Sequence, residues 1–392
     1  MRIYMDNAAT TRVTEPVFEA MKPYLCEIYG NPSSVHAFGR EALTALDRAR
    51  AQVAKALGAS PAEIYFTGCG TESDNWAIRG AAYARKRKGN HIITTQIEHH
   101  AVLHTCQQLE KEGFEVTYLP VDEYGLVHPE ELEKALRPET TVVSIMFANN
   151  EIGTIEPVAE LCKIAKAHGA LFHTDAVQAV GHVPIDVKTL DVDMLSLSGH
   201  KLHAPKGVGA LYIRNGVRIQ RFMEGGAQER TQRAGTENMA SIVALGAAIE
   251  LAVGKLDENV AKIAAMRDRL IERILGEIPY ARLNGHPEKR LPGNVNVCFR
   301  FIEGEALLLS LDLKGVAGSS GSACTSGSLD PSHVLLAIGL PHEIAHGSLR
   351  LTLSEENTME EVDYAVDALK EIVQRLRAMS PLYDEFLKSQ ED

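Results

Sequence analysis

His91-Ile92-Ile93-Thr94-Thr95 is a short run rich in β-branched residues, and Glu115–Val121 (Glu-Val-Thr-Tyr-Leu-Pro-Val) is a second run of this kind. Between them, His100–Glu112 places Val102, Cys106 and Leu109 at the four- and three-residue steps of an amphipathic helix. Two strands joined through a helix normally lie parallel in one sheet. This strand–helix–strand unit therefore predicts an α/β fold with a mostly parallel sheet that helices cover on both faces.

The same alternation continues along the first two thirds of the chain. We expect helices at Phe38–Leu57, Glu72–Arg87 and Val158–His168. The expected strands are Glu63–Thr67, Thr141–Phe147, Ala170–Thr174, Met194–Leu197 and Gly207–Ile213.

The pattern changes near residue 257. Glu258–Ile278 and Met359–Met379 are long, charged amphipathic segments, and they flank shorter strand-like pieces such as Asn294–Phe301. Such a pattern is typical of an α+β unit. We therefore expect a large domain over residues 15–256 and a small domain formed by residues 1–14 and 257–392.

The composition is ordinary for a globular protein and limits the classes of partner. The 392 residues include 40 Lys and Arg against 52 Asp and Glu, which gives a net charge of −12. An acidic balance argues against nucleic acid or an anionic membrane as the main partner. The nearly apolar stretch Met239–Ile249 is shorter than the ~20 residues of a membrane-spanning helix. Asp6 interrupts the N-terminus before a signal sequence can develop, so we expect a cytoplasmic protein.

The six cysteines include one in an unusual setting. None forms a CxxC pair, so a disulfide framework or a zinc ribbon is not expected. Cys324 lies in Gly318–Ser328 (GSSGSACTSGS), where no apolar neighbours bury the thiol and the backbone is free to move. We expect Cys324 to be a reactive thiol. The other five cysteines are expected to be structural: Cys26, Cys69, Cys106, Cys162 and Cys298.

Polar residues follow several predicted strands, and ligands of open parallel sheets bind beyond the carboxyl ends of strands. Gly68–Ser73 (GCGTES) is either a phosphate cradle at a helix N-terminus or a plain turn with Thr71 as N-cap. Lys201, which follows Ser198-Gly199-His200, is either an amine able to form a Schiff base or a surface lysine. Ser198 and His200 are additional phosphate-type donors.

Two more strand ends offer an acid and an amide. Asp175 could pair with the protonated pyridine nitrogen of pyridoxal phosphate, or it could cap the next helix. Asn149 and Asn150 could supply an amide to a cofactor oxygen, or they could only form a turn.

Histidines surround the start of the helix that follows His91–Thr95. His99 is the last residue before that helix, which suits a stacking and acid–base group above a ligand. His100 and His104 have the i, i+4 spacing of metal ligands, but Glu98 precedes the histidines, unlike the order in HExxH. We therefore expect no metal site.

Taken together, these motifs resemble the NifS/IscS-type cysteine desulfurases, which are class V aminotransferases of fold type I that depend on pyridoxal phosphate. The similarity runs from Tyr4–Thr11 and Gly30–Ser34 to Arg377–Pro381. The motifs that carry it are His173–Gly181 (HTDAVQAVG), Ser198–Lys201 (SGHK), Arg233–Asn238 (RAGTEN) and Ser319–Ser326 (SSGSACTS). It implies a mostly parallel, seven-stranded type of sheet in the large domain and a smaller α+β domain that carries the Cys324 loop, about residues 317–330.

The resemblance implies a role for each matching cofactor residue. Lys201 would hold pyridoxal phosphate as a Schiff base and move the substrate α-proton, and Asp175 would pair with the pyridinium. His99 would stack on the ring and shuttle protons. The ring oxygen would be contacted by Gln178 and Asn150. The phosphate would be bound by Gly70, Thr71, Ser198 and His200, together with Thr236 of the partner subunit in a homodimer.

The resemblance also implies the substrate and the reaction. Arg350 would clamp the carboxylate of L-cysteine, with Asn31 as a second candidate for that carboxylate. Cys324 would take the sulfur as a persulfide and pass it to an acceptor such as an iron–sulfur scaffold protein, leaving L-alanine. In such a transfer complex Cys324 could also be an iron–sulfur ligand. Alternatives on the same fold are a selenocysteine lyase, an aminotransferase, or an inactive scaffold component, and the short acidic Leu382–Asp392 lacks an IscS-like docking extension.

Overall fold

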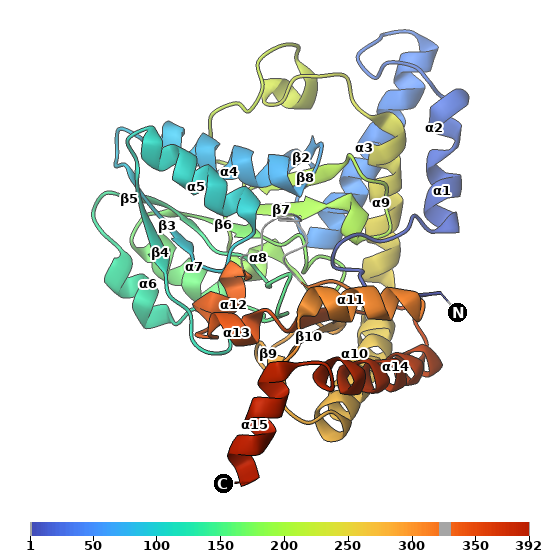
Figure 1. The fold of residues 1–392 in the computed structure, drawn as a ribbon. Helices are drawn as coiled ribbons and strands as arrows, with labels where there is room; N and C mark the ends of the chain where they lie inside the picture. The colour runs from blue at the N-terminus through green and yellow to red at the C-terminus, as the bar shows by residue number, and fades with distance from the viewer. Residues whose placement is uncertain (1, 321–330, 392) are drawn as a thin grey trace.

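The computed structural model describes residues 2–320 and 331–391. Figure 1 shows a central sheet between two layers of helices, with a second, smaller sheet beneath it. One apolar cluster joins the central sheet to α4 (Gly70–Ala84) and α5 (His100–Lys111). A larger cluster joins its other face to α3 (Ala37–Leu57), α7 (Val158–Ala167) and α9 (Met239–Gly254). The α/β fold predicted from the sequence is confirmed.

The central sheet has seven strands in the order β2-β8-β7-β6-β5-β3-β4. Their bounds are β2 Ile64–Thr67, β3 His91–Thr95, β4 Glu115–Leu119, β5 Thr140–Ser144, β6 Leu171–Asp175, β7 Met194–Ser198 and β8 Gly209–Ile213. The five strands from β4 to β7 pair in parallel, whereas β8 runs antiparallel to both β7 and β2. The strand–helix–strand unit predicted between His91 and Val121 is therefore present as β3, α5 and β4.

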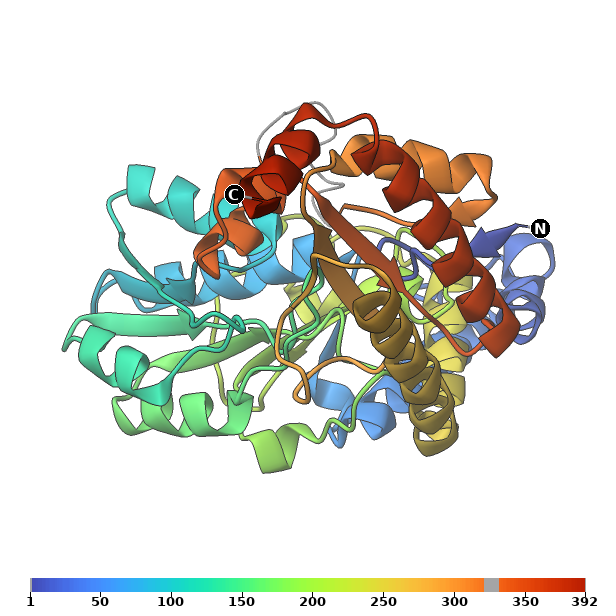
Figure 2. The ribbon, with the colours of Figure 1, turned by 60° about the horizontal axis from the view of Figure 1, so that its bottom comes forward.

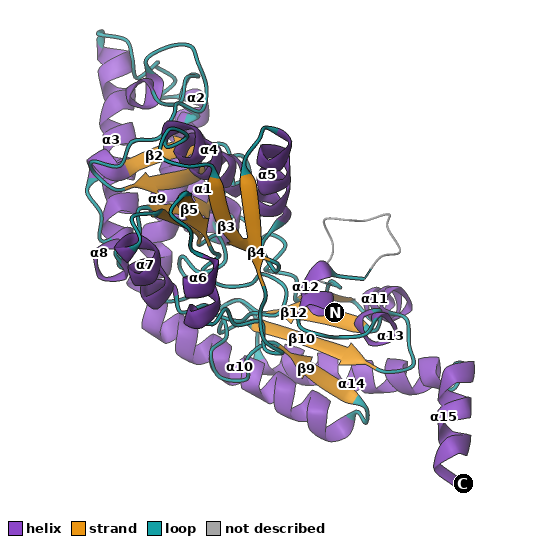
Figure 3. Cartoon of the chain, turned by 90° about the vertical axis from the view of Figure 1, so that its left-hand side faces the viewer, coloured by secondary structure: helices purple, strands orange, loops and turns teal. Residues whose placement is uncertain are grey.

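The second sheet belongs to the C-terminal part of the chain. It is antiparallel in the order β12 (Ser348–Thr352), β10 (Asn294–Phe299) and β9 (Ala281–Asn284). Figure 3 shows it beside α10 (Leu256–Glu277) and α14 (Met359–Arg377), with which it shares an apolar cluster. Helix α11 (Gly304–Leu313) joins the same cluster.

The N-terminal residues pack with this C-terminal part. Strand β1 (Ile3–Tyr4) pairs in parallel with β11 (Val316–Ala317), and Ile3 and Met5 are buried in the cluster around the second sheet. Figure 2 shows β1 beside the orange and red C-terminal elements. These contacts agree with a small domain made from both ends of the chain, and the division at residue 257 stays a prediction.

The other elements are short or lie at the edges of these layers. They are α1 Glu15–Met21, α2 Pro23–Cys26, α6 Pro129–Ala135, α8 Val187–Leu190, α12 His333–Ala337, α13 His342–Ala345, α15 Pro381–Glu391, and the 3₁₀ turns η1 Pro61–Glu63, η2 Gly199–Lys201 and η3 Gln228–Thr231. Within residues 2–320 and 331–391 no single helix is long and apolar enough to cross a membrane, although α9 and α10, which meet at a 72° bend, pass that test as a pair.

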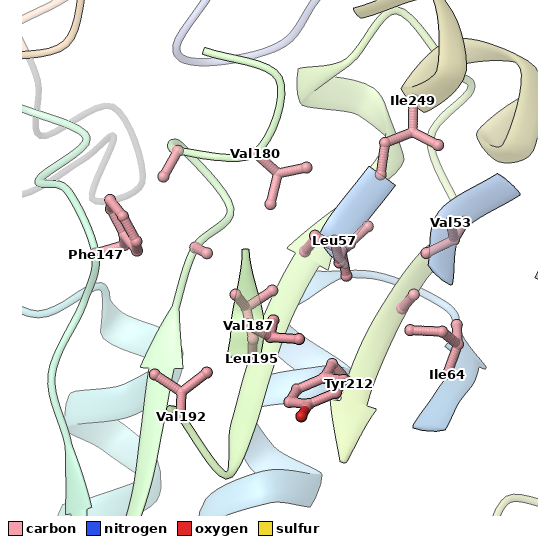
Figure 4. Packing of buried hydrophobic residues seen from close by; sticks show 14 of the residues in the cluster. Val53, Leu57, Ile64, Phe147, Val180, Val187, Val192, Leu195, Tyr212 and Ile249 are labelled. Carbon is pink, nitrogen blue, oxygen red and sulfur yellow. The ribbon is translucent and has the colours of Figure 1, made fainter. Parts of the chain in front are cut away.

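Branched aliphatic and aromatic side chains pack the central sheet against helices α3 and α9. Figure 4 shows Leu195 of β7 and Tyr212 of β8 packed with Val53 and Leu57 of α3 and Ile249 of α9. All five are buried. Because closely packed side chains resist sliding, β7 and β8 are held in a defined position relative to each other and to these helices.

A buried ion pair anchors the segment that precedes Arg233–Asn238. Arg50 of α3 binds Glu229 of η3 through two hydrogen bonds, of 2.8 and 2.7 Å, and the backbone N–H of Phe66 donates to the same carboxylate. Glu229 and the next two residues, Arg230 and Thr231, have positive φ angles, a conformation that costs energy for residues other than glycine. The ion pair therefore stabilises a strained turn.

We expect Glu229→Ala to lower the free energy of unfolding by about 3–5 kcal/mol, because it leaves the Arg50 charge buried without a partner. Chemical denaturation measures the change. Glu224→Ala, which removes an exposed carboxylate from the same segment, is the control and should cost less than about 0.5 kcal/mol. Equal losses of unfolding free energy in the two variants would show that the buried ion pair contributes no more to stability than an exposed carboxylate.

Candidate active site

The candidate site lies where two parallel strands of the central sheet end. Asp175 is the last residue of β6 and Ser198 the last of β7, and the register places Asp175 opposite Ser196. The turn η2 follows β7 at once and contains His200 and Lys201. The carboxyl ends of neighbouring parallel strands share one edge of a sheet, so the predicted acid, hydroxyl and amine lie on the same edge.

Lys201 lies among the polar residues of this edge. Its amine donates hydrogen bonds to the carbonyls of Ala8 and Ala9, the second at 2.7 Å. Its positive charge lowers the pKa values of His99 and His200 and also acts on Asp175. The surface-lysine interpretation is therefore wrong, because Lys201 is partly buried and surrounded by the predicted site residues.

The predicted anion cradle lies at the start of α4, where the backbone approaches a side chain closely. A Cβ atom on Gly70 would lie 2.6 Å from a methyl group of Val177, so only glycine allows this close approach. The buried Ser198 hydroxyl has no hydrogen-bond partner among the described residues. The N-cap of α4 is Cys69, and Thr71 lies one position inside the helix. The alternative in which Thr71 caps the helix is therefore wrong, because the helix begins two residues earlier than expected.

Two histidines at this edge are neutral near pH 7. Burial lowers the pKa of His99 to about 4, and the charge of Lys201 lowers it further. The backbone N–H of Ala101 donates to Nδ1 of His99, which caps α5, so the ring carries its proton on Nε2. Burial also lowers the pKa of His200 to about 4, and its Nδ1 lies 3.1 Å from the hydroxyl of Thr10. Both rings can thus exchange protons without carrying a fixed charge.

Asp175 is a buried carboxylate whose charge is costly. Burial raises its pKa to about 6, and this is opposed by the hydrogen bond that the Val177 N–H donates to it and by Lys201. Asp74, in α4, lies in the same buried layer, and its pKa is raised by burial and then by the charge of Asp175. A cationic ligand at Asp175 would relieve this cost. Gln178 lies nearby and donates to the carbonyl of Ala8 at 3.0 Å.

The structure separates the roles of the two adjacent asparagines. The Asn149 side chain donates to the carbonyl of Ile97 and accepts from the N–H groups of Glu151 and Ile152, so this residue is the turn former. Asn150 is partly exposed, and its carbonyl accepts a hydrogen bond of 3.0 Å from Arg350. Only Asn150 therefore remains as the candidate whose amide can reach a ligand.

Arg350 reaches the site from the second sheet. It lies on β12 and is 3% exposed. Its Nη2 donates to Oδ1 of Asp6 at 3.0 Å, while its Nε is buried with no hydrogen-bond partner in the described part of the chain. Sequence reasoning assigned no role in the site to Asp6, which it named only as an N-terminal acid and as part of the Tyr4–Thr11 motif. The available signal was a single acid in a motif whose other residues are uncharged.

Comparison with known proteins identifies the family. The family model for class-V aminotransferases matches residues 3–365. The chain belongs to the class-V aminotransferase family. Within it, the chain is 60% identical over 380 residues to the cysteine desulfurase IscS of Methanosarcina thermophila, covering 97% of this chain and 94% of that protein. It is 56% identical over 393 residues to the cysteine desulfurase IscS of Clostridium botulinum strain Hall, covering 100% and 99%.

Solved structures of NifS-like proteins share the fold of this class-V aminotransferase. One matches with a TM-score of 0.91 and 43% identity, covering 96% of this chain and 100% of the other. A second, from Rickettsia africae, matches with a TM-score of 0.86 and 31% identity, covering 95% and 100%. The resemblance to NifS/IscS-type cysteine desulfurases, and with it the fold class, is confirmed.

Two predicted residues of this class-V aminotransferase, Asn31 and Thr236, are exposed outside the group of side chains around Lys201, and a third lies outside the described residues. Asn31 is exposed in the loop between α2 and α3, where its Oδ1 accepts from the N–H of Ser33. Thr236 is exposed on the segment after η3. Cys324 lies outside the described residues. The roles expected for these three stay predictions.

The other histidines and cysteines give mixed outcomes. The rings of His100 and His104 stack at 5.0 Å between centroids, and His333, which sequence reasoning missed, lies 4.8 Å from His100. Among the described residues no three His, Cys, Asp or Glu side chains are arranged to hold a metal ion.

Cys106, Cys162 and Cys298 are buried as expected, whereas Cys26 is exposed, because the short helix α2 has no buried face.

Glu151 is a buried acid next to the site, and it makes the stability of the protein depend on pH. Burial raises its pKa to about 7, while a hydrogen bond from Ser332 and the charge of Arg350 lower it. The pKa is higher in the folded than in the unfolded state, so the stabilisation is complete below about pH 4 and is lost as the pH rises toward 7.

We expect Glu151→Gln to remove this loss. Relative to the unchanged protein, the variant should gain on the order of 2–3 kcal/mol of unfolding free energy between pH 4 and pH 8. Denaturant titrations at several pH values measure the gain. Glu305→Gln, on the exposed first turn of α11, is the matched surface substitution. A difference between variant and parent that does not change with pH would contradict the expectation.

Proposed function

We propose that the protein is a cysteine desulfurase that converts L-cysteine to L-alanine and holds the sulfur as a persulfide on Cys324. The observation that carries this proposal is the position of Lys201, whose charge acts on Asp175, His99 and His200 at the edge that also holds the anion cradle. The curated relatives at 56–60% identity are named cysteine desulfurases, which supports the same activity.

The residues at this edge fit pyridoxal phosphate. The unpartnered hydroxyl of Ser198 and the close approach at Gly70 suit its phosphate, which Thr71 and His200 would also contact. Asp175 would pair with the pyridinium nitrogen, and Gln178 and Asn150 would contact the ring oxygen. The chemistry that the bound cofactor supplies is an electron sink for the substrate α-carbon.

The protein side chains perform the remaining tasks. Lys201 would exchange its carbonyl partners for the cofactor, and its amine would then move the α-proton of the substrate. His99, with its proton on Nε2, would stack on the ring and shuttle protons. Arg350 would hold the substrate carboxylate, with Asn31 as a second candidate.

Cys324 completes the reaction as the sulfur acceptor. Its thiolate would attack the sulfur of the substrate, so that an S–S bond forms as the Cβ–S bond breaks. The electron pair of the broken bond stays with the carbon skeleton, which takes up a proton and leaves as L-alanine. The persulfide then passes to an acceptor such as an iron–sulfur scaffold protein, where Cys324 would also be available as an iron–sulfur ligand.

We further propose that the protein is a cytoplasmic homodimer. Thr236 is exposed after η3, so it is available to reach the phosphate in a neighbouring copy, and Asn31 is similarly exposed. The small domain of residues 1–14 and 257–392 would carry the Cys324 loop. Sedimentation or light scattering tests the dimer directly.

We expect Ser198→Ala to weaken binding of pyridoxal phosphate about tenfold or more, because a hydrogen bond to a charged group contributes ~1.5–3 kcal/mol. Absorbance titration of the apoprotein measures the affinity. Thr94→Val is the matched control, because the Thr94 hydroxyl is also buried without a partner but lies on β3. If both variants bound the cofactor as tightly as the parent, the phosphate would not be at this cradle.

We expect Cys324→Ser to abolish multiple-turnover release of sulfide from L-cysteine while pyridoxal phosphate stays bound. Sulfide and L-alanine are measured in the presence of a thiol reductant. Cys26→Ser, which removes an exposed thiol outside the site, should keep the activity of the parent. Full desulfuration by Cys324→Ser would show that another group takes the sulfur, and keto-acid formation or strict selenocysteine dependence would favour the aminotransferase or lyase.

A further inference from the structure

The guanidinium of Arg350 is a buried cation with one full counter-charge. Its Nη2 donates to Oδ1 of Asp6 at 3.0 Å, and its Nη1 donates to the uncharged carbonyl of Asn150. Glu151 also acts on Arg350, but burial raises the pKa of Glu151 to about 7, so it supplies only part of a negative charge near neutral pH. Asp6 is therefore the group that compensates the Arg350 charge before substrate binds.

The backbone places Asp6 at this position. Asp6 forms a parallel bridge with Thr352, two residues after Arg350 on β12. The N–H of Ala8 donates to the Thr352 hydroxyl at 2.8 Å, and the side chain of Asn7 donates to the Thr352 carbonyl at the same distance. The Asp6 side chain is 19% exposed against 3% for Arg350, so solvent reaches the acid more easily than the base.

A substrate carboxylate adds a second negative charge at the same guanidinium. Two carboxylates on one cation repel each other, and a buried setting strengthens the repulsion. Among the described residues the Nε of Arg350 has no hydrogen-bond partner, and the Asp6 contact accounts for only one N–H group of the guanidinium. An incoming carboxylate can therefore use the remaining donors of the guanidinium, but it competes with Asp6 for the same positive charge.

We propose that Asp6 is a positioning residue that holds Arg350 in the empty site and is replaced as its counter-ion by the carboxylate of the amino-acid substrate. This inference rests on the proposed function, because it takes Arg350 as the group that binds the substrate carboxylate. Asp6 thus stabilises the unliganded protein and at the same time lowers its affinity for carboxylate ligands. The two effects have opposite signs, which separates this role from a purely structural one.

Asp6→Asn tests the proposal, because asparagine keeps the Oδ1 acceptor and removes the charge. In the purified holoenzyme the midpoint of thermal unfolding without substrate should fall. The dissociation constant of L-alanine, measured by calorimetry, should decrease about threefold or more. The KM for L-cysteine should fall by a similar factor. The affinity for L-alaninamide, which has no carboxylate, should stay within twofold of the parent.

Glu356→Gln is the matched control. Glu356 pairs with Arg12 of the same N-terminal segment at a more exposed position. Among the described residues Glu356 makes no hydrogen bond or ion pair with Arg350, so the affinity of Glu356→Gln for L-alanine should equal that of the parent. Asp6→Glu retains the charge and should bind L-alanine within twofold of the parent, which provides a test even if Asp6→Asn does not fold.

Several results would overturn the proposal. A lower unfolding midpoint with unchanged or weaker binding of L-alanine in Asp6→Asn would show a structural role only. Equal tightening for L-alaninamide would indicate a general charge effect, and tighter L-alanine binding by Asp6→Glu would exclude competition by charge. Arg350→Lys tests the underlying assignment separately. If that variant bound L-alanine as well as the parent, the role of Arg350 in the proposed function would be wrong, whatever Asp6→Asn shows.

Discussion

The contact of the N-terminal segment, residues 6–12, with both sheets is the constraint on which the site depends. The carbonyls of Ala8 and Ala9 accept from Lys201, and that of Ala8 also accepts from Gln178. The hydroxyl of Thr10 contacts His200. At its other end the segment supplies Asp6 to Arg350. Groups from the segment after β6, from the turn after β7 and from β12 thus share the N-terminal segment as their common partner.

This arrangement explains why so many charged groups can be held in a partly buried site. A buried cation needs an acceptor or a counter-charge, and backbone carbonyls provide acceptors that cannot titrate. Lys201 is held by such carbonyls, whereas Arg350 is held by a carboxylate. The site also contains three buried acids, Asp175, Asp74 and Glu98, and burial raises the pKa of each. The site therefore combines several buried carboxyl groups with the Lys201 amine and the Arg350 guanidinium, which can exchange their present partners for a ligand.

Local patterns were sufficient for the strands of the central sheet and most of the helices between them, and for residues at the ends of those strands, but not for the core helix α9. The β3–α5–β4 unit follows from hydrophobic period alone, and Lys201 and Asp175 follow from their positions after strands. The partner of Arg350 could not be obtained in this way, because Asp6 and Arg350 are 344 residues apart and are brought together by an isolated bridge between Asp6 and Thr352 of β12. The choice between Asn149 and Asn150 depends on which side chain turns inward, which adjacent identical residues do not reveal.

The pairing of β1 with β11, and of Asp6 with Thr352, also has a consequence for how the protein is made. The ribosome produces the N-terminal segment before the central sheet, but the partners of that segment in β11 and β12 come after the last strand of the sheet. The seven strands of the central sheet all precede residue 214, so that sheet can assemble while the segment is still unpaired. The guanidinium of Arg350 can therefore meet Asp6 only after every strand of the central sheet has been synthesised. The part of the site around Arg350 thus assembles after the sheet that supports the rest of it.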